Sequence, residues 1–79
     1  MKINYKLDSD VNGNKKYIGK IDNSKNFEYY KFGENKNPYN YLIIQNENGG
    51  WSFAENTDEG KEIIRRIENE NRKDWQSCY

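Results

Sequence analysis

The sequence contains no histidine and a single cysteine, Cys78. Without histidine it has no Ser-His-Asp or Cys-His catalytic centre and no histidine-ligated zinc. A lone cysteine cannot form a disulfide within the chain, and no cysteine pair is present to hold a metal. We therefore expect neither an enzyme nor a disulfide-stapled secreted protein, and we predict no catalytic residues, no metal and no other cofactor.

Long apolar runs are also missing. The longest is Tyr41-Leu42-Ile43-Ile44, far short of the roughly 18–20 residues that span a bilayer. The N-terminal residues alternate apolar and polar and lack a signal-peptide core. These features predict a soluble, cytoplasmic protein that does not associate with membranes.

Neither sign of charge is in excess, and aliphatic side chains are few. Thirteen Lys and Arg balance thirteen Asp and Glu, which argues against strong generic binding of nucleic acid, because that affinity depends on phosphate neutralisation.

The aliphatic content is low enough to raise the question of disorder. The combined share of Leu, Ile, Val and Phe falls below the roughly 20% that warns of a disordered chain. Aromatic residues nevertheless make up 15% of the 79-residue chain. We expect a single folded domain, 1–79, whose core is built largely from rings.

Strand and turn patterns fill the chain up to residue 54. Residues 1–7 place apolar side chains at every second position, as in a half-buried strand. Residues 8–14 are mostly turn-forming, and Asn12-Gly13 within them is the strongest hairpin signal. Further strands are expected over residues 15–21, 27–32, 39–45 and 51–53.

The C-terminal part predicts one helix, over about residues 57–73. Asn56 is the expected N-cap, with Glu59 at the third helical position. Gly60 is the weak point, since glycine costs about 1 kcal/mol relative to alanine in a helix. A narrow apolar stripe consists of Ile63, Ile64 and Ile67. The expected fold class is α+β, an antiparallel β-meander of four to five strands with one C-terminal α-helix packed on one face. A curled sheet closing toward a small barrel is the competing architecture.

The rings outnumber what such a helix can cover. Alternate side chains of a strand point to opposite faces, so a helix on one face covers only about half of them. The others would form an exposed aromatic patch, of the kind found at protein interfaces. Cross-strand ring pairing inside the sheet is the alternative explanation. The candidate partner-binding residues are Tyr29, Tyr30, Phe32, Tyr39 and Tyr41 on the strands, with Arg65, Arg66 and Arg72 on the helix.

Lysines interleaved with rings suggest a second kind of site. Bases can stack on rings of a sheet while lysines contact phosphates. The candidate nucleic-acid-binding residues are Lys15, Lys16, Tyr17, Lys20 and Lys31. The zero net charge, the absence of a ring-Gly-ring motif and a first arginine only at Arg65 argue against this alternative.

Two other features have ordinary explanations. Residues 8–13 match the opening half of a calcium loop, but the position that needs a closing glutamate is Gly19, and a hairpin turn explains the same residues. Trp75 either packs the helix on the sheet or anchors a partner. Cys78 lies next to the end of the sequence and could form an intermolecular disulfide on oxidation.

With catalytic, metal-binding and membrane functions set aside, the sequence predicts a small non-enzymatic protein-binding module. Inhibitors encoded by phages and other AT-rich mobile elements, anti-defence and anti-CRISPR proteins among them, have this profile. The partner would be a larger protein that the sequence does not identify. A single-strand nucleic-acid-binding domain is the alternative, and self-association through an uncovered face or an open strand edge is a further outcome.

Overall fold

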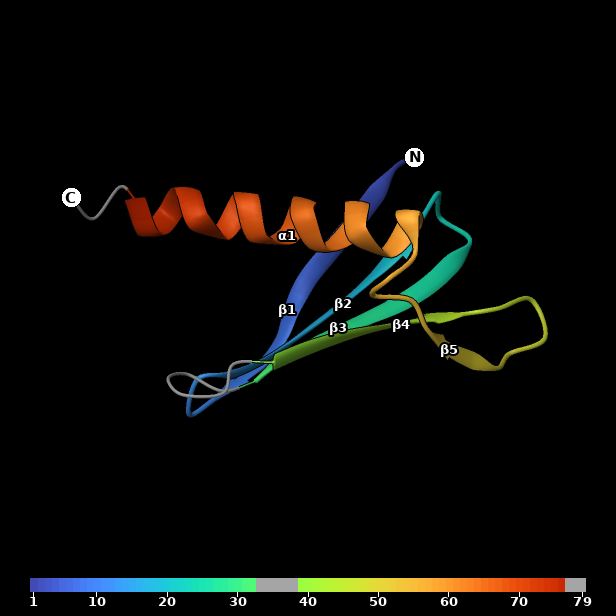
Figure 1. Ribbon diagram of the computed structural model, residues 1–79, viewed down its shortest axis with the longest axis horizontal. Helices are drawn as coiled ribbons and strands as arrows, with labels where there is room; N and C mark the ends of the chain where they lie inside the picture. Colours follow the sequence, from blue (N-terminus) through green and yellow to red (C-terminus); the bar gives the residue numbers. More distant parts are fainter. Residues whose placement is uncertain (33–38, 77–79) are drawn as a thin grey trace.

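The chain folds as a five-stranded antiparallel sheet with one helix across it (Figure 1). The computed structural model describes residues 1–32 and 39–76, with the backbone alone at Tyr39 and at 72–76. The elements are β1 (Ile3–Val11), β2 (Asn14–Ile21), β3 (Lys25–Phe32), β4 (Tyr39–Gln45), β5 (Trp51–Phe53) and α1 (Asp58–Gln76). The strands neighbour one another in chain order, with β1 and β5 at the edges. The predicted α+β meander is confirmed, and the sheet does not close into a barrel.

The first hairpin is tighter than the sequence suggested. The turn comprises Asn12 and Gly13, whose φ angles of 54° and 84° suit a two-residue turn that needs positive φ at both positions. β1 therefore extends to Val11, and the expected long turn over 8–14 is wrong. A register shift between Leu7 and Ser9 adds one residue to β1 and keeps the strand paired beyond it. Most of the calcium-like motif is thus strand, and no metal-binding cluster occurs within 1–32 and 39–76.

The core lies between α1 and one face of the sheet. Ile63 and Ile67 of α1 are 0% and 1% exposed, which confirms the apolar stripe as the face that packs. They join side chains from the strands in one cluster. The largest fully buried strand residues are Tyr29, Phe27, Ile21 and Leu42, and Tyr17 beside them is 4% exposed. Three of the ten described core residues are rings and the other seven are aliphatic, so the expectation of a core built largely from rings holds only in part. No helix in the described part of the chain has the length and apolar character needed to cross a membrane.

The start of α1 corrects the sequence-based assignment. The N-cap is Thr57 rather than Asn56, because the Thr57 hydroxyl accepts a hydrogen bond from the Gly60 amide at 2.9 Å and donates one to the Ala54 carbonyl at 2.8 Å. Gly60 lies directly against that carbonyl: a Cβ at this position would be 1.7 Å from the Ala54 oxygen. Glycine is therefore required here, and its cost in helix propensity is offset by the close approach that it allows.

Gly60→Ala should lower the free energy of unfolding by about 1–3 kcal/mol, because the added methyl group must displace the backbone at Ala54. Helix propensity alone predicts the opposite sign, a gain of up to about 1 kcal/mol. Urea denaturation measures the difference. Lys61→Ala is the matched control at the neighbouring exposed position and should change stability by less than about 0.5 kcal/mol. A stabilised Gly60→Ala variant would contradict this account of the helix start.

Candidate functional site: the open face of the sheet

The open face is the side of the sheet opposite to α1. Residues directly opposite each other on antiparallel strands share a face. One such row runs from Lys16 through Tyr30 to Tyr41, and another includes Ile43 and Phe53. These rows alternate with the buried rows that contact α1. All of these side chains therefore lie on the face that the helix leaves uncovered.

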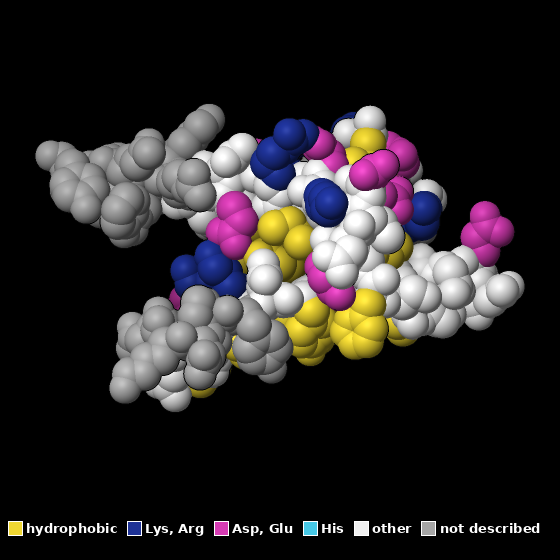
Figure 2. Space-filling view, in the orientation of Figure 1, with side chains coloured by type: hydrophobic (Ala, Val, Ile, Leu, Met, Phe, Trp, Pro, Cys, Tyr) yellow, Lys and Arg dark blue, Asp and Glu magenta, His cyan; other side chains and the backbone are white. Residues whose placement is uncertain are grey.

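Four rings form a continuous aromatic strip on the open face across β3, β4 and β5: Tyr30, Phe32, Tyr41 and Phe53. The Tyr30 and Tyr41 rings are stacked with centroids 4.7 Å apart, and Phe53 meets Tyr41 edge-on at 5.7 Å. These are distances at which aromatic pairs attract each other. Phe53 is nevertheless 70% exposed. Hydrophobic side chains accordingly gather along the side of the molecule away from α1 (Figure 2).

Charged side chains contact the Tyr30 end of the strip. The Tyr30 hydroxyl donates a hydrogen bond to Glu28 Oε1 at 2.6 Å, and this bond is the main reason that the pKa of Tyr30 is raised. Lys16 Nζ lies 4.0 Å from Glu28 and 3.7 Å from Asp8, and the Glu28 charge raises the pKa of Lys16. Lys16 therefore stays protonated, but two carboxylates offset its charge.

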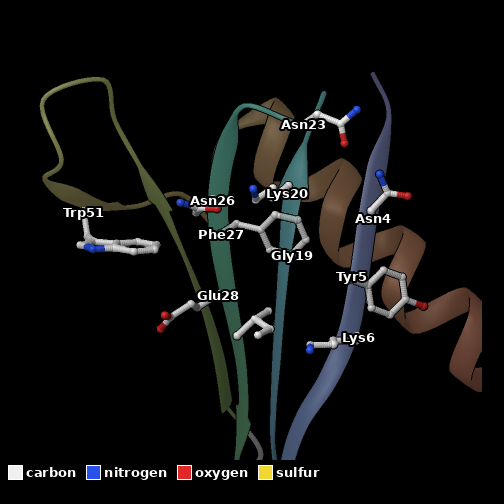
Figure 3. A pocket seen from close by; sticks show the side chains of 11 residues that line it. Asn4, Tyr5, Lys6, Gly19, Lys20, Asn23, Asn26, Phe27, Glu28 and Trp51 are labelled. Carbon is white, nitrogen blue, oxygen red and sulfur yellow. The ribbon is translucent and has the colours of Figure 1, made fainter.

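A depression of about 540 Å³ lies beside the strip, over β1, β2 and β3; we call it the hollow. Residues that line it include Asn4, Lys6, Ile18, Lys20, Glu28 and Trp51. Figure 3 shows Trp51 on one side of the hollow and Asn4 and Lys6 on the other, with Lys20 between them. Trp51 is 42% exposed. The open face thus combines an apolar strip with a polar-rimmed depression.

Tyr29 is the clearest correction to the predicted contact residues. It is 0% exposed and lies on the helix side of β3, since it neighbours Tyr30 in the strand and points the other way. Its hydroxyl donates to Glu68 at 2.8 Å and accepts a hydrogen bond from Asn40 at 2.6 Å. Tyr29 belongs to the core and has no surface to offer a partner.

The arginines do not join the rings on one surface. Arg65 and Arg66 are exposed on α1, across the sheet from the strip, and pair within the helix with Glu62 and Glu70. The predicted surface of tyrosines and arginines is therefore divided between two sides of the molecule. Tyr30, Phe32 and Tyr41 do lie together on the open face. The side chains of Tyr39, Arg72 and Trp75 and the whole of Cys78 lie outside the described residues.

The lysine and ring set predicted for nucleic acid is divided in the same way. Lys16 and Lys20 are on the open face, whereas Lys15, Tyr17 and Lys31 are on the helix side. Tyr17 is only 4% exposed, and Lys31 forms an ion pair with α1. This set cannot act as one contact surface.

Sequence reasoning missed Trp51 and Phe53. Their spacing of two residues places both on one face of a strand. The face itself is decided by pairing with β4, where Phe53 is opposite Ile43 and Trp51 is opposite Gln45. A three-residue strand carries too little pattern to indicate that register in advance.

Comparisons with protein-family models, with curated proteins and with solved structures find no match to this chain.

The buried tyrosines predict a loss of stability in alkali. Burial raises the pKa of Tyr29 and of Tyr17 above the ordinary value of 10.0. Above about pH 10 the unfolded chain therefore binds fewer protons than the folded one, so stability that is fully present below that pH falls as pH rises. Urea midpoints between about pH 8 and pH 11 should show this decrease.

Tyr29→Phe is the control for that titration. The variant loses the hydrogen bonds at Glu68 and Asn40 and should be less stable than the parent protein near neutral pH. The variant also lacks one of the tyrosine hydroxyls whose pKa is raised by folding. The difference in free energy of unfolding between the parent protein and the variant should therefore shrink above about pH 10. A difference that stays constant across this range would show that Tyr29 titrates as it does in the unfolded chain.

Proposed function

We propose that this protein is a non-enzymatic protein-binding module whose contact surface is the open face of the sheet. The observation that carries the proposal is the aromatic strip, which runs without a break over three strands and has no covering element among the described residues. Contiguous exposed apolar surface of this kind is typical of interaction sites, whereas single exposed apolar residues are ordinary.

The strip is suited to protein contacts because it is held in place before binding. Stacking between Tyr30 and Tyr41 and the hydrogen bond from Tyr30 to Glu28 restrict these rings in the free protein. A rigid surface loses less conformational entropy on association than a mobile one. Tyrosine and tryptophan rings also provide large contact areas for few rotatable bonds.

The charges beside the aromatic strip favour a protein over a nucleic acid as the ligand of the strip. A nucleic-acid surface needs lysines that are available to phosphates. Lys16, which lies over the Tyr30 ring, is instead paired with Glu28 and Asp8. Binding of a nucleic acid to the strip would overturn the proposal.

Three finer points stay predictions from the sequence. These are that the chain is not an enzyme, that its partner is a larger protein which it inhibits, and that it comes from a phage or mobile element and acts in the cytoplasm. The anti-defence and anti-CRISPR classes belong to the same set of predictions. The open face supports the binding role itself.

Phe53→Lys should weaken binding to the protein partner about tenfold or more, because it places a charge in the exposed part of the strip. Phe53 contributes little to the core, so the variant should stay folded. Arg65→Ala on the exposed side of α1 is the matched control and should bind as the parent protein does. The experiment compares the three proteins for stoichiometric capture of a partner from bacterial lysates, followed by calorimetry with that partner.

Three results would contradict the proposal. One is a partner that Phe53→Lys retains and Arg65→Ala loses, which would assign binding to α1. Another is salt-sensitive binding of single-stranded oligonucleotides that Phe53→Lys leaves unchanged. The third is failure to capture any stoichiometric protein across several hosts, which would count against a protein-binding role.

A further inference from the structure

The hollow has a composition different from that of the strip beside it. Its volume of about 540 Å³ falls in the range of roughly 300–1,000 Å³ that is common for ligand sites. Ile18 lies between Lys6 and Glu28 in one cross-strand row, and Lys20 lies between Asn4 and Asn26 in the next. An apolar centre is therefore bordered by lysines on β1 and β2.

The unbalanced charge of the hollow is positive. No ion pair to Lys6 or Lys20 occurs within residues 1–32 and 39–71. Glu28 is the acidic group of the lining, but its carboxylate accepts the Tyr30 hydroxyl and lies 4.0 Å from Lys16. Figure 3 shows the Glu28 carboxylate directed away from β1, so it does not face Lys6. An anionic group would accordingly be attracted to the β1 and β2 side.

The opposite side of the hollow is aromatic. Trp51 is paired with Gln45 on β4, and Gln45 accepts a hydrogen bond from Asn26 at 2.9 Å. These contacts connect the Trp51 position to the row that carries Lys20. A bound group would thus meet an indole ring at one end and two ammonium groups at the other.

We infer that the hollow receives an acidic apolar segment of the partner, with its aromatic or aliphatic side chain against Trp51 and its carboxylate toward Lys6 and Lys20. The inference rests on the proposed function, because it states the chemistry of the partner at the same face. It also fixes an orientation: the carboxylate lies over β1 and β2, and the apolar body lies toward β5. Free phosphate would satisfy the lysines but would leave the Trp51 side of the hollow empty.

The test uses 3-phenylpropionate as a small probe of this chemistry, titrated into the full chain labelled with nitrogen-15. Saturable shifts are expected at the Trp51 indole and at the amides of Lys6 and Lys20. The uncharged analogue 3-phenylpropanamide should bind about threefold or more weakly, the size expected for exposed charge pairs. Lys6→Gln/Lys20→Gln should remove that preference, and Lys61→Gln on α1 should keep it. Trp51→Phe assigns the indole signal and should reduce binding of both probes.

Several outcomes would overturn the inference. Equal affinity for 3-phenylpropionate and 3-phenylpropanamide would show that the lysines do not contribute to binding. Inorganic phosphate that shifts the lysine amides as strongly as the probe would indicate a general anion site, and the absence of saturable shifts would leave the hollow without this ligand. Each of these results is independent of the Phe53→Lys measurement. If Phe53→Lys still weakens partner binding, the proposed function stands and only the assignment of the hollow fails.

Discussion

The packing of α1 against one face of the sheet is the contact on which the rest of the structure depends. Ile63 and Ile67 are fully buried there, and the Thr57 cap with the close approach of Gly60 to Ala54 sets where the helix begins. A single helix can cover only one side of a five-stranded sheet. Because strand side chains alternate between faces, this one contact divides the rings into a buried set and an open set.

The two sets of tyrosines are held in different ways. On the helix side, hydroxyls reach polar groups of the layers that they join: Tyr29 bonds to Glu68 of α1, and Tyr5 bonds to Glu70. These hydrogen bonds lie at the margin of the core, where the hydroxyls of rings on the helix side reach carboxylates of α1. On the open face, Tyr30 bonds to Glu28 on its own strand and stacks on Tyr41. That arrangement leaves ring surface available, which is the physical basis of the proposed binding role.

The fold was predictable because its signals are local. Period-two alternation, the Asn12-Gly13 turn and the isoleucine spacing each arise within a short segment, and a meander needs no long-range connection. The candidate site was only partly predictable. Tyr29 and Tyr30 look alike in sequence, and only the choice of face makes one core and the other surface. The same holds for Tyr17, and the tight contact at Gly60 depends on Ala54, which pattern and propensity do not reveal.

The central claim is that the folded monomer has one covered and one open set of rings. Relaxation enhancement of the aromatic protons by a soluble neutral paramagnetic agent tests it most directly, at a dilution where light scattering shows a monomer. The account predicts strong broadening for Phe53 and Trp51 and protection for Tyr29 and Phe27, in line with their burial. Protection of Phe53 and Trp51 in the monomer would contradict it, because the open face would then be covered by the chain itself.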